Sequence, residues 1–324
     1  MQNMNHQIDM DISVVVPLYN KEEYICRAVR SIALQTFQPR EIVIVNDGST
    51  DDSVRVVESL NVPNLRVVHQ KNQGVSSARN NGIHEARYTW VAFLDADDEW
   101  MPDFLSTMRR LHEVYPEQDV YASAYYLGDY NGSKRKIVLN GIMFNGNEGL
   151  LSNYFNVAAQ SSPPVCSSSV CIRKQALMDI NGFPLNIKSG EDLLTWARLA
   201  AIQAPAYSTM PLAVFWQVKS HTYDDRPNRV PEALDPVGHS LAELKKVRGQ
   251  EIPFLDKYIS HWHKMRASVF LRLEMRSSAF KECILGIYYQ PNNIRLYIYI
   301  LMMLLPDRVV MSLFKRFAGK VSDD

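Results

Sequence analysis

The chain carries no excess of either charge, because its 35 Lys and Arg residues balance its 35 Asp and Glu residues. This balance argues against a nucleic-acid-binding protein that works through bulk positive charge. The four cysteines contain no CxxC pair and no histidine at matching spacing, so no zinc site is predicted. Cys26 and Cys283 lie in apolar helical patterns typical of buried free thiols, which favours a cytoplasmic protein.

Long hydrophobic runs are also absent. Residues 1–11 form a polar tail without the apolar segment of a signal peptide, so none is expected. A strongly apolar stretch, Ile294 to Leu305, has about half the length needed to cross a bilayer. With 324 residues, 46% of them hydrophobic, the chain can bury one large core or two smaller ones.

Short β-branched runs alternate with helical patterns between Ile12 and Leu94. The alternation predicts an α/β fold with a mostly parallel central sheet flanked by helices. Expected strands cover residues 12–16, 41–45, 65–68 and 90–94, and expected helices cover residues 22–34, 51–60 and 75–85. Because ligands of such sheets bind at the carboxyl ends of the strands, we expect the four loops there to line one site.

Three carboxylates follow the fourth strand, in Leu94-Asp95-Ala96-Asp97-Asp98. Mg²⁺ and Mn²⁺ prefer oxygen ligands and usually keep phosphates and waters in their shell. An Asp-x-Asp at a strand end therefore suits a metal bound to a diphosphate. The alternative is an acidic turn before a helix, where Asp98 and Glu99 would favour the helix dipole. We assign Asp98 to this structural role.

Two more loops at the same strand ends carry polar groups. Asp47, followed by Gly48, can accept a hydrogen bond from the imide N–H of uracil or thymine, although a plain strand–turn–helix junction explains it too. The segment from Gln70 to Asn80 begins a helix whose backbone N–H groups can meet an anion. Arg79 either reaches a phosphate there or pairs with an acid such as Asp95.

Four segments in order carry a family resemblance: Val14 to Asn20, Asn46 to Ser49, Gln70 to Asn80 and Phe93 to Asp98. Together they are similar to the family 2 inverting glycosyltransferases of the GT-A fold, of the type that builds bacterial cell-surface polysaccharides. The resemblance covers about Ile12 to Val218. Asn46 stands where the family more often has the first acid of Asp-Asp-Gly-Ser.

The resemblance implies roles for individual residues. Pro17, Tyr19 and Asp47 would line the nucleoside pocket, with Arg79 also on the donor side. Asp95 would contact the ribose, and Asp97 would bind the Mn²⁺ or Mg²⁺ that bridges the diphosphate.

Gly190-Glu191-Asp192 opens a predicted helix, residues 191–202, and resembles the family's Glu-Asp element. Asp192 would then be the general base that deprotonates the acceptor hydroxyl. One in-line attack on the anomeric carbon inverts it, so a single base suffices. The alternative is that both acids only favour a helix N-terminus.

The chain departs from the family after its last predicted strand. Family members often carry Tyr-Arg-x-His there, whose histidine can join the metal shell, and this chain has Trp216-Gln217-Val218-Lys219. Either His221 takes the histidine's place, or the metal relies on Asp97 and phosphates, or the site is weakened. Lys219 cannot bind a metal while protonated, but it can neutralise a diphosphate.

The chain is expected to contain one catalytic domain followed by a helical region. We expect a glycosyltransferase domain over residues 12–220, with a nucleotide half (12–100) and an acceptor half (101–220), and a helical region over 221–324. In the acceptor half we expect strands at 120–127, 165–172 and, as a pair broken by Pro211, 207–218. Basic residues interleaved with apolar ones from Arg308 to Lys320 are typical of a helix on an anionic membrane surface, or of a helix that packs on the domain.

The leading hypothesis is transfer of a sugar from a nucleotide sugar, a UDP-sugar by preference, to a hydroxyl of a glycan or lipid-linked saccharide at the inner face of the membrane. A catalytically weak nucleotide-sugar-binding protein of the same fold is the second hypothesis. A sugar nucleotidyltransferase ranks last, since the loop from Pro17 to Asn20 is not a glycine-rich phosphate loop. The sequence does not identify the sugar or the acceptor.

Overall fold

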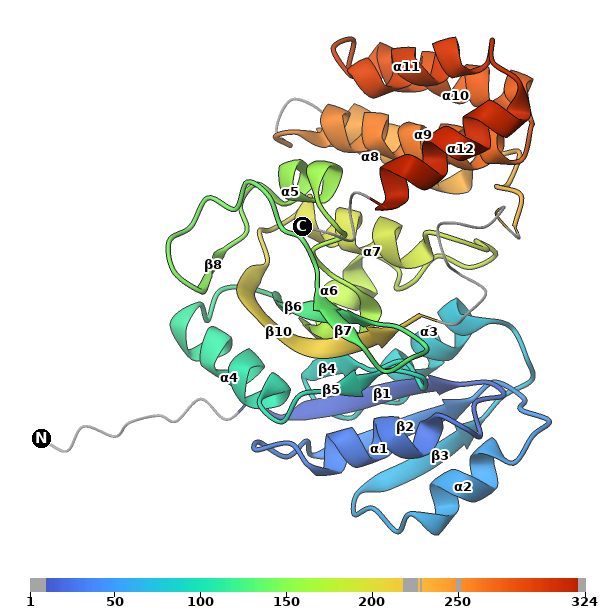
Figure 1. Ribbon diagram of the computed structural model, residues 1–324. Helices are drawn as coiled ribbons and strands as arrows, with labels where there is room; N and C mark the ends of the chain where they lie inside the picture. Colours follow the sequence, from blue (N-terminus) through green and yellow to red (C-terminus); the bar gives the residue numbers. More distant parts are fainter. Residues whose placement is uncertain (1–9, 218–226, 228, 249–251, 320–324) are drawn as a thin grey trace, which may run out of the picture.

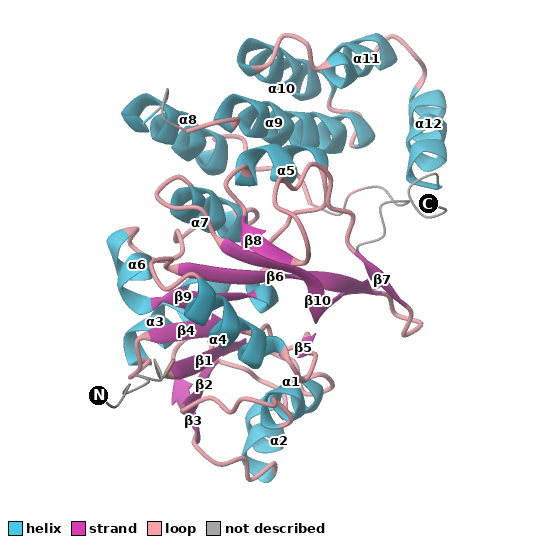
Figure 2. Ribbon diagram, turned by 90° about the vertical axis from the view of Figure 1, so that its left-hand side faces the viewer, coloured by secondary structure: helices cyan, strands magenta, loops and turns pink. Residues whose placement is uncertain are grey.

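A computed structural model describes residues 10–217, 227, 229–248 and 252–319. A twisted central sheet with helices on both faces occupies one end of the molecule, and a layer of C-terminal helices occupies the other (Figures 1 and 2). The sheet is mixed, with the order β3-β2-β1-β4-β9-β6-β10-β5, and β7 and β8 pair with β6 and β10. The predicted α/β architecture with a C-terminal helical extension is confirmed.

The first four strands form one parallel part of the sheet, and β6 and β10 form another parallel pair. β9 joins the first part to β6 through antiparallel pairing on both of its sides. The strands are β1 (Ile12–Leu18), β2 (Glu41–Asn46), β3 (Leu65–His69), β4 (Trp90–Phe93), β5 (Glu99–Trp100), β6 (Val120–Gly128), β7 (Lys134–Lys136), β8 (Glu148–Leu150), β9 (Val170–Arg173) and β10 (Ala206–Trp216).

The helices cover the sheet and then form their own layer. Those that alternate with the strands are α1 (Ile25–Ala33), α2 (Ser53–Ser59), α3 (Val75–Glu85), α4 (Phe104–Val114), α5 (Tyr154–Gln160), α6 (Lys174–Asp179) and α7 (Glu191–Ala200). Those of the C-terminal layer are α8 (Pro236–Arg248), α9 (Leu255–Arg272), α10 (Arg276–Tyr289), α11 (Ile294–Met302) and α12 (Asp307–Gly319).

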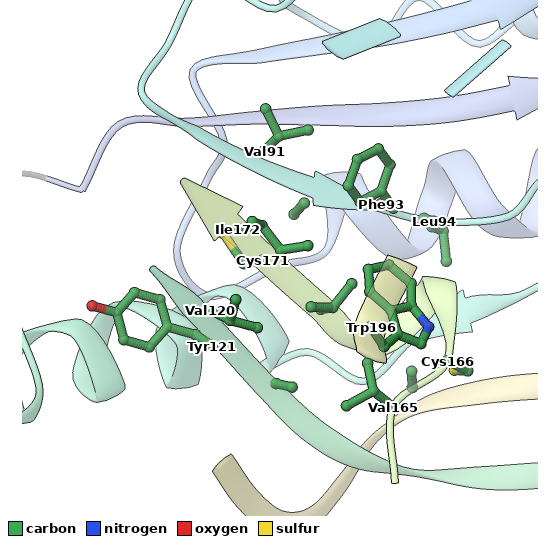
Figure 3. Packing of buried hydrophobic residues seen from close by; sticks show 14 of the residues in the cluster. Val91, Phe93, Leu94, Val120, Tyr121, Val165, Cys166, Cys171, Ile172 and Trp196 are labelled. Carbon is green, nitrogen blue, oxygen red and sulfur yellow. The ribbon is translucent and has the colours of Figure 1, made fainter. Parts of the chain in front are cut away.

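β1 and β4 are fully buried, as expected for central parallel strands with helices on both faces. Figure 3 shows Cys171 and Ile172 of β9 between the neighbouring strands, next to Phe93 and Tyr121. This apolar packing holds the ends of β4 and β9 together, and the acidic loop leaves the sheet at that point.

Two predicted strands differ from the structure. The expected pair over 207–218 is one strand, β10, whose register shifts at Pro211. Proline has no N–H to donate, so the irregularity lets the strand continue past it. The expected strand at 165–172 begins with a 3₁₀ turn, Ser167–Ser169, and only then enters β9.

The C-terminal helices share the core of the sheet domain. Val237 of α8 and Ile259 of α9 belong to the same buried cluster as the strands, and α9 packs on α5. The helices that follow bury two smaller clusters, around Phe270 and around Cys283. Among the described helices, none combines the length and hydropathy needed to cross a membrane. The division predicted at residue 220 stays a prediction, since residues 218–226 lie outside the described ranges.

A buried ionic network joins α8, α9 and α10. The Arg266 Nε lies 2.9 Å from the Glu282 carboxylate and 3.4 Å from that of Asp235, while His263 Nδ1 lies 2.7 Å from Glu282. Burial alone would raise the pKa of Glu282, but the His263 hydrogen bond and the Arg266 charge hold that pKa below its ordinary value. The ionised carboxylate is therefore a stabilising part of this layer.

We expect Glu282→Gln to lower the free energy of unfolding by about 3 kcal/mol at pH 7, because it removes the nearer of the two carboxylates that neutralise the buried Arg266. A carboxyl with a depressed folded-state pKa contributes stability above its unfolded pKa and loses it as the pH falls through the folded pKa. The difference between variant and wild type should therefore shrink below about pH 4. Urea unfolding at pH 7 and pH 3.5 measures it.

Glu243→Gln is the matched control, because Glu243 pairs with Lys246 on the exposed surface of α8. It should cost less than about 1 kcal/mol. Equal losses in the two variants would contradict the role of the buried network.

Candidate active site

The carboxyl ends of β1, β2 and β4 meet at one edge of the sheet, because β1 pairs with both neighbours. The loop after β1 is fastened to the loop after β2: the Lys21 N–H donates to Ser53 Oγ at 2.8 Å and the Thr50 N–H donates to Asn20 Oδ1 at 2.8 Å. Pro17 is buried in β1, and Tyr19 is 45% exposed at its end. Two of the three residues of the predicted nucleoside pocket thus lie at this edge.

Asp47 is buried at the end of β2, where three protein donors hold its carboxylate. They are the Gln70 side-chain amide at 2.7 Å and the backbone N–H groups of Gln73 at 2.9 Å and Gly74 at 2.8 Å. A carboxylate offers about four acceptor positions, so one remains for an imide N–H. Gly48 is essential to this turn, since it has φ of +74° and an added Cβ would lie 3.0 Å from the Asn72 nitrogen.

Both polar atoms of the Asn46 side chain have a partner. Its Nδ2 lies 3.1 Å from His69 Nδ1 at the end of β3, and its Oδ1 accepts the Ser49 N–H at 2.9 Å. Asn46 therefore ties the ends of β2 and β3 together beneath the Asp47 loop.

Arg79 joins two acidic segments from distant parts of the chain. Its guanidinium is buried, lies 2.7 and 3.0 Å from the Asp95 carboxylate oxygens and 3.5 Å from Glu191 Oε1, and stacks 5.1 Å from the Phe183 ring centroid. Of the two alternatives for Arg79, pairing with Asp95 is the one that the structure shows. Arg79 thereby orients Asp95 and the start of α7 toward each other.

Asp97 lies beside two cations of the segment that follows β1. The Lys21 Nζ is 2.6 Å from Asp97 Oδ2, and the Arg27 guanidinium donates to the Asp97 backbone carbonyl. Among the described residues, none is recorded as donating to Oδ1 of Asp97, whose side chain is 23% exposed. Sequence reasoning did not single out Lys21, because no motif connects it with an acid 76 residues away.

Asp98 has the structural role expected of an acid in a turn, since its N–H donates to the Asp95 carbonyl at 3.0 Å, but no helix begins there. Asp98 is 1% exposed, precedes β5 rather than a helix, and accepts hydrogen bonds from Ser168 Oγ at 2.5 Å and the Trp216 N–H at 2.9 Å. Burial, together with the charges of Asp95 and Asp97, raises its pKa well above the ordinary value. Asp98 therefore fastens the acidic loop to the 3₁₀ turn and to the end of β10.

Asp192 lies in the first turn of α7, directly after Gly190 and Glu191. Burial raises its pKa despite the nearby Arg79 cation. Burial also raises the pKa of Tyr154 of α5 and of Tyr258 of α9, and the Asp192 charge adds to both shifts. Asp192 is thus close to two phenols, one of them from the C-terminal layer.

Gly190 connects that layer to the start of α7. It has φ of +87°, and an added Cβ would lie 2.7 Å from the Trp262 ring of α9. The Trp262 Nε1 donates to the Asp235 carboxylate at 3.0 Å, so the buried ionic network holds the indole in place. Only glycine fits here without strain, and α9 is the wall behind the predicted base.

Asp97 is suited to bind a divalent cation by its chemistry and exposure, but a neighbouring lysine competes for its charge. Asp97 offers a partly exposed carboxylate, the kind of oxygen ligand that Mg²⁺ and Mn²⁺ prefer, but Lys21 already neutralises it. His221, the other candidate ligand, and Lys219 lie outside the described residues. A second cluster, of Asp235, His263 and Glu282, has ligand atoms within 4.8 Å of one another, but Arg266 already lies between its carboxylates.

The arrangement matches a known class of protein. Over 96% of this chain and 91% of the other, the fold resembles that of Staphylococcus aureus TarS residues 1–349 in complex with UDP-GlcNAc, with a TM-score of 0.62 and 21% identity. Another structure of TarS residues 1–349 gives a TM-score of 0.61 at 22% identity. This likeness establishes the GT-A type of fold.

Residues 13–180, more than half of the chain, match the model of Glycosyl transferase family 2, and the chain belongs to this family. It is 44% identical over 99 residues to the uncharacterized glycosyltransferase YibD of Escherichia coli. This aligned segment covers 30% of this chain and 29% of YibD. It is 33% identical over 156 residues to glycosyltransferase GlyA of Streptococcus pneumoniae. This aligned segment covers 48% of this chain and 20% of GlyA. The chain thus spans less than a third of these relatives.

We expect Arg79→Gln to lower the free energy of unfolding by about 3–5 kcal/mol, because it leaves the Asp95 and Glu191 carboxylates without their buried cation. Arg110→Gln is the control: Arg110 pairs with Glu148 at the surface, and its loss should cost under about 1 kcal/mol. Chemical denaturation measures both. An Arg79→Gln protein of unchanged stability that has lost only nucleotide affinity would show instead that Arg79 binds phosphate.

Proposed function

We propose that the protein transfers a sugar from a nucleotide sugar to a hydroxyl group of a glycan or lipid-linked saccharide, with inversion at the anomeric carbon. The observation that carries the proposal is the Arg79 ion network, because it unites Asp95 of the Asp-x-Asp loop with the Glu191-Asp192 helix start. Two motifs separated by almost 100 residues thereby form a single acidic site at the ligand-binding edge of the sheet. Family membership and the TarS fold support the same reaction class.

Donor binding is assigned to the edge formed by β1 and β2. Asp47 offers its spare acceptor position to a base imide, which favours a uracil nucleotide, and Tyr19 and Pro17 flank it. Asp95 is assigned to the ribose. The TarS complex, which holds UDP-GlcNAc, supports a UDP-sugar of the hexose or N-acetylhexosamine class.

Asp97 is assigned to a Mn²⁺ or Mg²⁺ ion that, when bound, neutralises the leaving diphosphate as a Lewis acid. Asp192 accepts the proton of the acceptor hydroxyl as that oxygen attacks. Burial raises its pKa, which makes it a stronger base than an exposed aspartate. Arg79 pairs with Asp95 and with Glu191, the first residue of α7. Asp192, the next residue, is then left to meet the acceptor.

Donor turnover tests the assignment. With UDP-GlcNAc first in a panel of UDP-sugars, and with Mn²⁺ present, Asp192→Asn should reduce transfer by about 10²- to 10⁴-fold with little change in nucleotide affinity, because it removes only the base. The rate of the wild type should fall at acid pH as Asp192 is protonated. Asp97→Asn should weaken nucleotide binding in the presence of Mn²⁺.

Unchanged turnover in both variants would overturn the residue assignments. Nucleotide binding that is insensitive to Mn²⁺, without any turnover, would favour a nucleotide-sugar-binding protein of the same fold. Both outcomes can be separated by calorimetry with and without metal.

The membrane-facing surface is proposed to be α10 and α11 rather than α12. The apolar face of α12 is already used: Val310 is 1% exposed, and the Phe314 ring lies 5.7 Å from that of Tyr299. By contrast α10 and α11 each present an exposed apolar stripe at helical spacing, made of Phe280, Ile284 and Tyr288, and of Ile294, Tyr297, Ile298 and Leu301. The exposed cations Lys281, Arg295 and Arg308 lie on or beside these helices, which suits an anionic bilayer at the cytoplasmic face.

Sedimentation with lipid vesicles tests this surface. The wild type should bind vesicles that contain phosphatidylglycerol and should bind neutral vesicles more weakly, whereas Leu301→Asp should lose most of the binding. Val247→Asp is the control, because Val247 is also exposed but lies on α8. A protein that ignores both kinds of vesicle but self-associates through Leu301 would assign the surface to a second copy of the chain.

A further inference from the structure

Two cation–carboxylate pairs lie at the acidic loop, and they differ in how firmly they are held. Arg79 and Asp95 are joined by two hydrogen bonds, and the Arg79 side chain is 4% exposed. Lys21 and Asp97 are joined by a single contact of 2.6 Å, and their side chains are 31% and 23% exposed. The first pair is a fixed part of the structure, whereas the second can be separated at low cost.

The Lys21 ammonium occupies a position that a metal bound to Asp97 Oδ2 would need. A Mg²⁺ or Mn²⁺ ion on the lone pair of Oδ2 that faces Lys21 would lie about 2.0–2.2 Å from that oxygen, in the direction where the ammonium nitrogen lies at 2.6 Å, so both cannot be held there. The two cations also repel each other. A metal that binds this side of Oδ2 therefore displaces the lysine, whereas a metal bound through Oδ1 alone would be opposed only by the lysine charge.

The surroundings of Lys21 allow that movement. Its backbone is fixed by the N–H bond to Ser53, while its ammonium is held only by Asp97 among the described residues, apart from a distant contact with the Tyr24 ring at 5.8 Å. A lysine has a flexible four-carbon stem and acts as a point charge, so it can follow a diphosphate without strict geometry.

We propose that Lys21 is an exchangeable counter-ion of Asp97, which pairs with the carboxylate in the donor-free protein and passes to the diphosphate when the metal arrives. The inference rests on the proposed function, in which Asp97 binds the metal. Lys21 thereby opposes metal binding in the absence of nucleotide and favours it in the presence of nucleotide. Metal and nucleotide affinities are then coupled, each raising the other by the same factor.

Calorimetric titration of Mn²⁺ into the protein, with and without UDP, tests the exchange without any activity measurement. Lys21→Gln should bind Mn²⁺ about tenfold more tightly than wild type when no nucleotide is present, because the competing charge is gone. The same variant should show a smaller increase of Mn²⁺ affinity on addition of UDP. Lys21→Arg, which keeps the charge, should stay near the wild type.

Lys246→Gln is the matched control, because Lys246 also lies 2.6 Å from an acid, Glu243, but on the surface of α8. It should leave both Mn²⁺ affinities unchanged. Lys21→Gln binding Mn²⁺ as the wild type does, while Asp97→Asn loses it, would overturn the exchange and leave the proposed function standing. If Asp97→Asn binds Mn²⁺ as well as the wild type in both conditions, the metal assignment itself fails and the exchange fails with it.

Discussion

The buried guanidinium of Arg79 is the interaction on which the geometry of the site depends. It comes from α3, and it pairs with one acid at the end of β4 and with another at the start of α7. A buried arginine is tolerated because its partners supply charge and the Phe183 ring covers its face. Without that cation, Asp95 and Glu191 would repel each other, and the two motifs would not share one site.

Next to the Arg79–Asp95 pair, the three carboxylates of the acidic loop differ in how deeply they are buried and in which groups they bind. Asp98 is buried and accepts hydrogen bonds from two elements, Asp95 is partly exposed and bound by arginine, and Asp97 is partly exposed and bound by a lysine. Three neighbouring carboxylates thus have three different tasks, which follow from burial and partner rather than from residue type. The most weakly held of them is the one best suited to exchange its partner for a metal.

Local patterns predicted the sheet and its helices well, because periodicity and turn residues act over short distances. The helix at 75–85 has the bounds expected from the sequence. The parallel arrangement of the first four strands also follows from the βαβ rules, which bring Pro17, Asp47 and Asp95 to one edge. The partners of Asp97 and Asp98 could not be predicted in this way, since Lys21, Ser168 and Trp216 are distant in sequence and belong to no motif.

For the C-terminal helices, the amphipathic sequence pattern did not predict which apolar faces are buried and which stay exposed. The basic helix after residue 307 is amphipathic, but its apolar face packs on its neighbours, whereas α10 and α11 keep their apolar stripes exposed. The same layer reaches the candidate active site through Trp262, which lies against Gly190 and is held by Asp235. α9 therefore contacts α10 on one side and the start of α7 on the other. The C-terminal helices, which the sequence suggests are a separate extension, thus form a wall of the candidate site. Because Trp262 of α9 packs against Gly190, the stability of this layer helps to set the position of Asp192.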